Sequence, residues 1–205
     1  MKKPTHAFKE IADVIDQDMA ARAYAFKQMA AHSEYRSLLG TIARVCITAL
    51  DKKHKIMACG NGGSFADAQH MIAEFVGAYK NRNRPPMAAL MLPTNSSDFS
   101  AIANDYGYEE VFARPLRGLG KKDDILFGIS TSGGSKNIIK AFEAANEMGI
   151  YTIALTGQNP SEMSRIANIW LPAPATVTNI IQEVHIQYIH SICGAVENHF
   201  FGKGR

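Results

Sequence analysis

Five short, almost continuously apolar runs follow one another between residues 56 and 174, and they predict buried strands. The runs are IMACG (56–60), MAALML (87–92), ILFGIS (125–130), YTIALTG (151–157) and IWLPAP (169–174). Helical periodicity lies between most of them, for example over Lys136–Met148. Apolar strands that alternate with helices are typical of a parallel sheet covered on both faces. The pattern therefore predicts an α/β fold with a five-stranded parallel sheet.

The chain before the first strand has a different pattern. From residue 8 to about residue 53, apolar residues recur at spacings of three and four, among them Ile11, Ile15, Leu39 and Ile42. This spacing predicts two amphipathic helices. Their broad apolar faces need a surface, either the next layer of the fold or a second copy of the chain. Residues 93–104, after the second strand, are the longest predicted loop and a candidate binding surface.

Bulk composition limits the class of protein. A chain of 205 residues fits one domain, 1–205, in which 1–53 form a helical extension that packs on the core and on neighbouring subunits. No segment is apolar for the 18 or so residues of a membrane span, and no signal-peptide core follows the N-terminal lysines, so we expect a cytoplasmic protein with no membrane partner. A net charge of +3 gives no argument for nucleic acid, and the three separated cysteines are interpreted as reduced core residues.

The first strand runs into a glycine-rich turn, GNGGS, and then into a helix. The glycines allow a tight turn whose amides point outward, and Ser64 is predicted to cap the helix. Such a turn favours an anion or a sugar oxygen. A dinucleotide fingerprint does not fit because Phe65 stands where it needs glycine, and a P-loop does not fit because Gly-Lys-Ser/Thr is missing.

His70 and Glu74 are four residues apart on the predicted helix, so they share one face, nearly opposite the apolar stripe. An isolated pair of this kind is more often an ordinary solvated contact than a functional site. The predicted C-terminal helix, 179–200, carries Gln182, His185 and His190 in or beside its apolar stripe. Each of these is more often a core polar group with a satisfied hydrogen bond. Only a Gln–His pair aimed at His70 and Glu74 would change that interpretation.

The third strand runs into GISTSGGS, directly before a predicted helix. Four hydroxyls surround two glycines here, from Ser130, Thr131, Ser132 and Ser135. A helix N-terminus binds anions through unpaired N–H groups, and hydroxyls add donors. The alternative is a serine-rich cap with no ligand. Because a cap needs fewer hydroxyls and glycines, the turn is predicted to hold a phosphate.

Four motifs together resemble the sugar isomerase (SIS) domain family and, within it, the phosphoheptose isomerases. They are GNGGSFADAQHMIAEF, IANDYGYE, GISTSGGS and IQEVHIQYIH, and the resemblance is close from Lys55 to Phe200. It implies a three-layer flavodoxin-like fold and a homotetramer with sites at subunit interfaces. It also implies conversion of sedoheptulose 7-phosphate, a phosphorylated seven-carbon sugar, to D-glycero-D-manno-heptose 7-phosphate. That reaction would be the first step of nucleotide-activated heptose biosynthesis for lipopolysaccharide or capsule.

The resemblance also implies roles for individual residues. Substrate would contact Asn61, Gly62, Gly63, Ser64, Glu74, Asn104, Asp105 and Gln182, with its phosphate on Ser130, Thr131, Ser132 and Ser135. One zinc ion per subunit would be bound by His70, Glu74, Gln182 and His190. His185 matches a family position without a catalytic role. Asn179 departs from the pattern, because some phosphoheptose isomerases have aspartate there.

A ketose–aldose isomerase needs a base, an acid and a means to stabilise an enediolate. We expect Glu74 to be the base, His190 the proton donor and zinc the Lewis acid. A carboxylate bound to zinc is a weaker base, so another group remains open as the base. Two rival functions also remain open, an isomerase of another phosphosugar and a non-catalytic protein that binds a phosphosugar or a replication initiator. The presence of His70, Glu74 and His190 argues against the second.

Overall fold

The structure is a computed structural model that describes residues 6–202, so the two ends of the expected domain 1–205 lie outside the described residues. Its elements in chain order are α1 (His6–Ala31), α2 (Ser33–Asp51), β1 (Ile56–Gly60), α3 (Gly63–Val76), β2 (Ala89–Met91), α4 (Ser96–Tyr106), the 3₁₀ helix η1 (Tyr108–Glu110), α5 (Ala113–Leu119), β3 (Ile125–Ile129), α6 (Lys136–Glu147), β4 (Tyr151–Thr156), α7 (Glu162–Ile166), β5 (Ile169–Pro172) and α8 (Thr178–Phe201).

The five predicted strands form one sheet in the order β2-β1-β3-β4-β5, and all neighbouring strands are parallel. Successive strand residues point to opposite faces. Ile56 and Ala58 belong to the core cluster on one face, and Met57 and Cys59 to the cluster on the other. Both faces of the central strands are therefore buried, which explains why these strands are almost continuously apolar, although β4 also buries Thr152 and Thr156.

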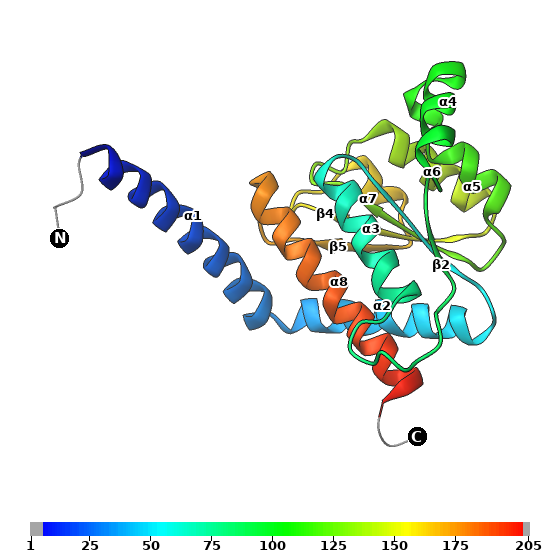
Figure 1. Cartoon of the computed structure of the whole chain (residues 1–205), viewed down its shortest axis with the longest axis horizontal. Helices are drawn as coiled ribbons and strands as arrows, with labels where there is room; N and C mark the ends of the chain where they lie inside the picture. The colour runs from blue at the N-terminus through cyan, green and yellow to red at the C-terminus, as the bar shows by residue number, and fades with distance from the viewer. Residues whose placement is uncertain (1–5, 203–205) are drawn as a thin grey trace.

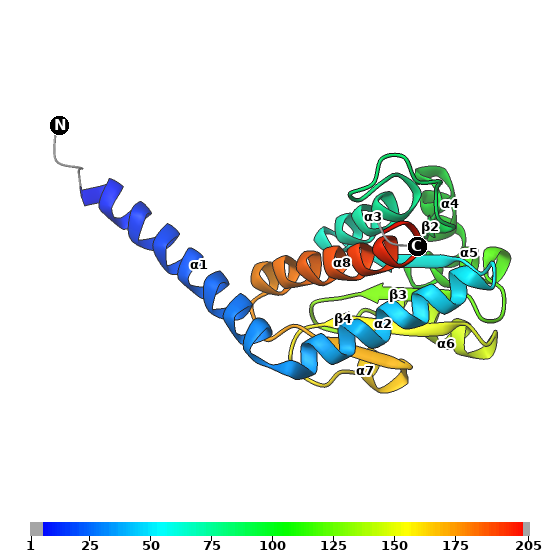
Figure 2. The same cartoon turned by 90° about the horizontal axis from the view of Figure 1, so that it is seen from below.

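Helices cover the two faces and give the predicted three layers (Figures 1 and 2). On one side, α2, α3 and α8 bury residues such as Cys46, Met71 and Tyr188 against the sheet. On the other side, α5, α6 and α7 bury Leu116, Phe142 and Met163. The expected α/β fold is confirmed. Within it, α3 and α8 lie side by side (Figure 1), and this pair of helices carries the four predicted metal ligands.

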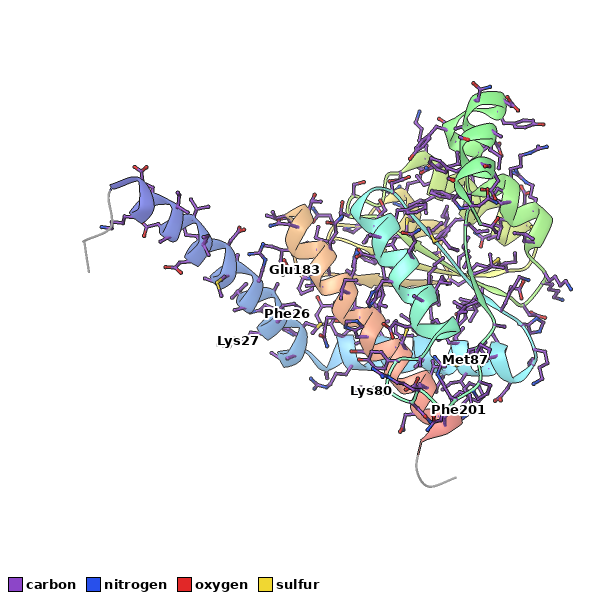
Figure 3. The ribbon with its side chains drawn as sticks, viewed as in Figure 1. Phe26, Lys27, Lys80, Met87, Glu183 and Phe201 are labelled. Atoms are coloured by element: carbon purple, nitrogen blue, oxygen red, sulfur yellow. The ribbon has the colours of Figure 1, made fainter. Side chains whose placement is uncertain are left out.

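The two predicted N-terminal helices are also confirmed, but they are used differently. α2 packs on the sheet, whereas most of α1 projects away from the body of the molecule (Figures 1 and 2). The C-terminal part of α1 meets α8, where Arg22 Nε donates to Glu183 Oε1 over 2.6 Å. Figure 3 shows Phe26 and Glu183 at this junction. Further out, the apolar side chains of α1 are 52–64% exposed, namely those of Ile11, Val14, Ile15 and Met19. No other part of the described chain covers this apolar stripe.

The prediction of a loop over residues 93–104 is wrong, because most of these residues belong to α4. Asn95 starts this helix with a capping box: its side chain accepts from the amides of Ser97 and Asp98, and the Asp98 carboxylate accepts from the amide of Asn95. A reciprocal cap of this kind stabilises a helix that has only a weak apolar pattern. The one buried residue of α4 is Ile102.

Two further expectations concern the bulk properties. The cysteines Cys46, Cys59 and Cys193 are free and buried, as predicted, and burial raises the pKa of each thiol. Among the described residues, no helix combines the length and the apolar character that crossing a bilayer demands.

Candidate active site

Two βα turns meet at the carboxyl edge of the sheet. β1 ends at Gly60 and β3 ends at Ile129, and these residues are partners in the parallel pairing of the two strands. The turns that follow, 61–62 and 130–135, therefore start side by side. Ligands of open parallel sheets bind beyond the carboxyl ends of the strands. The two turns singled out in the sequence thus contribute to one surface.

The first turn differs from its prediction in one detail. Ser64 does not cap α3, because the helix already begins at Gly63 and the capping position is Gly62, with no side-chain cap bond. Gly62 has a φ of 54°, a left-handed conformation that glycine adopts without strain and that reverses the chain before the helix. Ser64 is therefore the second residue of the helix and is buried.

Three potential metal ligands converge where α3 and α8 lie side by side. His70 Nε2 is 2.9 Å from His190 Nε2 and 3.4 Å from Glu74 Oε1. One ligand atom from each residue lies within 4.8 Å of the other two. The side chains of His70 and Glu74 are 43% and 19% exposed, so the group is reachable from solvent. The structure thus joins the His70–Glu74 pair to a histidine 120 residues away.

The contact between the two imidazoles shows what this group can bind. At 2.9 Å, one Nε2 must carry a proton and donate a hydrogen bond, and the other Nε2 must accept this hydrogen bond. Without that proton, both lone pairs and the Glu74 carboxylate point toward a common position, which favours a cation. Two imidazole nitrogens and one carboxylate oxygen are a donor set that zinc accepts, with a fourth position left open. A solvated His–Glu pair would not account for the place of His190.

Gln182, the fourth predicted ligand, lies at the other end of the shared helix face. A Cβ atom on Gly63 would lie 2.4 Å from its Nε2, so the side chain packs against the start of α3. No hydrogen bond joins it to His70, Glu74 or His190 in the described part of the chain. Gln182 lines a cavity of about 470 Å³ with Asp67 and Asn179.

His185 is a buried structural residue. Its Nε2 is 3.1 Å from the carbonyl oxygen of Thr156 and donates to it, because a carbonyl can only accept. Burial lowers the pKa of His185 to about 4, so the ring is neutral near pH 7. Its buried Nδ1 has no partner within the described residues. This environment agrees with the absence of an expected catalytic role.

The serine turn before α6 is partly organised by its own hydroxyls. Ser130 is buried, lies 3.0 Å from the hydroxyl of Ser135 and accepts from the amide of Gly133. Ser132 accepts from the amide of Gly134. The hydroxyl of Thr131 makes no hydrogen bond in residues 6–202. The amides of residues 136 and 137 also have no acceptor there, as expected for the first turn of a helix.

Asn61 ties the two turns together. Its Nδ2 donates to Asn137 Oδ1, and its Oδ1 accepts from Asn137 Nδ2, both over 2.9 Å. The hydroxyl of Tyr108 donates to the same Oδ1 over 2.9 Å. Asn61 and Tyr108 also line a cavity of about 450 Å³ together with Phe65 and Gln69. The Asn61 amide is thus held by α6 and η1 at the wall of this cavity.

Asn104 and Asp105 lie on α4 rather than in the predicted loop. Their side chains bond to each other, from Asn104 Nδ2 to Asp105 Oδ1 over 2.8 Å. This is the one side-chain hydrogen bond that either residue makes in the described part of the chain. Within residues 6–202 of a single subunit, no hydrogen bond connects them to the three potential metal ligands or to the serine turn.

Asp67 is a candidate that sequence reasoning missed. It lies on α3 one turn before His70, and it is buried although its Oδ2 has no hydrogen-bond partner among the described residues. Burial raises the pKa of Asp67 to about 6, because desolvation disfavours the carboxylate. An unpaired buried carboxylate in the wall of a cavity is costly, which is typical of a functional site. Its burial depends on the packing of α8, so no local sequence signal could have pointed to it.

Comparison with known proteins identifies the family. Residues 22–157 match the model of the SIS domain. The phosphoheptose isomerase of Akkermansia muciniphila is 50% identical over 161 residues, which are 78% of this chain and 85% of that protein. That of Helicobacter pylori (strain P12) is 43% identical over 193 residues, 94% of this chain and 99% of that protein.

Solved structures agree with the sequence relatives. The structure of the phosphoheptose isomerase GmhA from Neisseria gonorrhoeae superposes with a TM-score of 0.85 at 36% identity. The match covers 92% of this chain and 99% of that one. The expected resemblance and enzyme class are confirmed. The chain belongs to the SIS domain family and, within it, to the phosphoheptose isomerases.

Proposed function

We propose that this isomerase interconverts sedoheptulose 7-phosphate and D-glycero-D-manno-heptose 7-phosphate. The observation that carries the proposal is the convergence of His70, Glu74 and His190 on the face that α3 and α8 share, in a chain of this family. The relatives are named for a phosphorylated heptose, and the serine turn offers unpaired donors suited to its phosphate.

The substrate has two expected contact regions. Its phosphate binds at the serine turn, through Ser130, Thr131, Ser132, Ser135 and the free amides of α6. Its sugar oxygens lie toward Asn61, Gly62, Gly63 and Ser64, beside the cavity lined by Asn61 and Tyr108. Asn104 and Asp105 complete the sugar site. Because they are exposed on α4, we propose that they act when subunits assemble or when α4 moves inward.

We propose a zinc ion at the group formed by His70, Glu74 and His190, with Gln182 as the fourth ligand. The two nitrogens and one carboxylate oxygen support this choice of metal. Gln182 has to turn from the start of α3 toward His190 to join them. When bound, zinc supplies Lewis-acid polarisation of the substrate carbonyl.

The residues perform the proton transfers. Glu74 removes a proton from C1 of the ketose, and the electron pair moves to the carbonyl at C2, which gives an enediolate. His190, through the ring nitrogen that does not bind the metal, donates a proton to the C2 oxygen and accepts the proton of the C1 hydroxyl as the aldehyde forms. The proton held by Glu74 returns to C2, so no atom is gained or lost. Glu74 has two carboxylate oxygens, one of which can act as base while the other faces the imidazoles.

Asn179 stands where the resemblance implies aspartate in some phosphoheptose isomerases. It lines the cavity of Gln182 and Asp67. We propose that Asp67 supplies the carboxylate of this cavity wall. It would replace the carboxylate that an aspartate at position 179 would provide. If an aspartate at that position normally orients the sugar, Asn179 lowers the rate or changes the sugar preference.

We propose a homotetramer with active sites at its interfaces. The support is α1, whose apolar stripe of Ile11, Val14, Ile15 and Met19 is exposed along a helix that leaves the body. A second copy of the chain is the partner that buries such a stripe. The single domain 1–205 and the cytoplasmic location stay predictions.

One experiment tests the proposed function. Purified protein is incubated with sedoheptulose 7-phosphate, and aldose formation is followed before and after complete removal of metal by a chelator. We expect turnover that chelation abolishes and zinc restores. Binding without turnover would favour a non-catalytic sensor. Undiminished turnover after chelation would remove zinc from the mechanism while leaving the reaction intact.

A further inference from the structure

A buried ion pair joins the loop after α3 to the end of α8. Arg84 Nε donates to Glu197 Oε2 over 2.7 Å, and the two side chains are 0% and 5% exposed. Burying two charges carries a free-energy penalty because both lose their hydration. The attraction between the charges offsets this penalty only when further hydrogen bonds satisfy both groups. The role of the pair therefore follows from the further hydrogen bonds that Arg84 and Glu197 make.

Arg84 holds the C-terminal end of α3. Its Nη2 donates to the carbonyl of Glu74 over 2.5 Å, and its Nη1 donates to the carbonyls of Phe75 and Pro85. The last carbonyls of a helix have no partner within the helix, and a cation at this end is favoured by the helix dipole. Arg84 thus fixes the backbone of Glu74, one of the three potential ligands.

Glu197 holds the loop against α8. Its carboxylate accepts from three consecutive amides, those of Tyr79, Lys80 and Asn81, over 2.8–3.0 Å. Burial alone would raise the pKa of Glu197, but the bonds from Arg84 and the three amides together outweigh burial and hold the pKa below its ordinary value. Glu197 follows His190 by seven residues, two helical turns, so the two side chains share a face of α8.

The loop held by Glu197 supports the ring of His190. The rings of Tyr79 and His190 have centroids 5.6 Å apart. Tyr79 reaches this position because residue 194 is glycine: a Cβ there would lie 3.0 Å from Tyr79 Cε1. The backbone amide of the same tyrosine is bound by Glu197. The ion pair therefore touches both sides of the metal-binding group, Glu74 directly and His190 through Tyr79.

We propose that Arg84 and Glu197 are positioning residues for the metal-binding group. They set the distance between α3 and α8, and with it the place of Glu74 relative to His190. The inference rests on the metal site of the proposed function. Groups that orient metal ligands typically contribute about 10–100-fold to metal affinity or activity, because a small displacement of a ligand weakens its bond to the ion.

The test compares Glu197→Gln and Arg84→Lys with a matched control, Asp124→Asn. Asp124 is also a buried carboxylate with a cationic partner, Lys55, and it accepts from the amides of Lys55 and Lys121 near the amino ends of β1 and β3. Zinc affinity is measured by competition with a chromophoric chelator, the visible spectrum of Co²⁺-loaded protein is recorded, and kcat and KM are determined.

We expect both variants of the pair to lose about 10–100-fold in zinc affinity. Their Co²⁺ spectrum changes and kcat falls, while KM for the sugar phosphate stays within about twofold. Asp124→Asn lowers the melting temperature but leaves zinc affinity and the spectrum as in the wild type. Equal zinc affinity in the wild type, Glu197→Gln and Arg84→Lys would overturn the inference.

Gly194→Ala serves as a second variant that is expected to fold, since alanine favours a helix more than glycine does. Its methyl group displaces Tyr79 from His190 without touching the ion pair. We expect zinc affinity to fall about two- to tenfold, the factor that corresponds to a ring contact. Unchanged affinity together with an unchanged Co²⁺ spectrum would contradict the role of Tyr79. A wild-type protein that binds no zinc would refute the metal site itself.

Discussion

The face shared by α3 and α8 belongs to the layer that covers one side of the sheet, the serine turn before α6 lies at the carboxyl edge of the sheet, and the two regions also differ in chemistry. The first region carries imidazoles and carboxylates, from His70, Glu74, His190 and Asp67. The second carries only hydroxyls and amides, which keep their charge state across the physiological pH range. The helix face can therefore exchange protons or bind a cation, whereas the turn can only hold an anion in place.

This difference predicts how substitutions divide between rate and affinity. Changes on the helix face should act on kcat, on metal binding or on the pH dependence of stability. Changes at the turn should act on KM, because they remove binding that ground state and transition state share. A substitution with the opposite effect would break this division.

Glu74→Gln is expected to have the largest effect. Loss of a general base costs about 10²–10⁴-fold in kcat, and exchange of the C1 proton with solvent should disappear, while KM changes little. Exchange is followed by NMR in deuterated water. The matched control is Glu147→Gln, an exposed position on α6 that should behave as the wild type. Exchange retained by Glu74→Gln would show that the base is another group.

Asp67→Asn should change the pH dependence of stability. The pKa of Asp67 is raised to about 6 in the folded chain from an ordinary value of 3.8, so folding becomes less favourable as pH rises between these values. Replacement by asparagine should therefore raise the free energy of unfolding by about 1–3 kcal/mol above pH 6, with no gain below pH 4.

Denaturant unfolding of metal-free protein at several pH values measures this effect. Asp16→Asn, at an exposed position on α1, is the control and should not change the pH profile. The same gain for Asp67→Asn at pH 4 and pH 8 would contradict desolvation as the cause of the raised pKa, because burial penalises only the ionised carboxylate.

Thr131→Val tests the serine turn. The substitution keeps the shape of the side chain but removes a hydroxyl that is free to bind phosphate. Loss of one hydrogen bond to a charged group costs about 1.5 kcal/mol, so KM should rise about tenfold with kcat nearly unchanged. Steady-state kinetics measure both constants. Thr48→Val, on the exposed face of α2, is the control. A fall in kcat at constant KM would reverse the assignment of the two regions.

Tyr108→Phe should have the smallest effect. It removes one of the bonds to the side-chain oxygen of Asn61 and leaves the bonds to Asn137 in place. A neutral hydrogen bond contributes about 1 kcal/mol, so KM should rise about fivefold. Tyr106→Phe is the control, since its hydroxyl contacts Arg114 instead. If both tyrosine variants behave alike, Asn61 does not depend on Tyr108.

The sequence predicted the sheet well because the central strands β1, β3 and β4 are buried and almost continuously apolar. It failed where a few local bonds decide the outcome. The Asn95–Asp98 capping box makes a helix of a segment that looks like a serine-rich loop, and the positive φ of Gly62 starts α3 before Ser64. In both places, short-range hydrogen bonds and backbone conformation decide between a turn and a helix, and the spacing of apolar residues contains no information on that choice.

The candidate site was only partly visible from spacing. Four residues separate His70 from Glu74, so their shared face follows from helix geometry alone. His190 is remote in sequence, and only the resemblance to a family connected it with them. Asp67 and the ion pair of Arg84 and Glu197 were not found, because burial and partners arise from the packing of α8 on α3. The roles of all the site residues, Gln182, Asn104 and Asp105 among them, remain predictions.

The place of His190 in the chain has a consequence for biosynthesis. α8 follows all five strands in the sequence, whereas His70 and Glu74 come directly after the first. A ribosome must therefore translate the whole sheet before the last donor can meet the other two. Truncated translation products that end before α8 would lack His190, and if the proposed zinc site is correct they should bind zinc more weakly than the full chain.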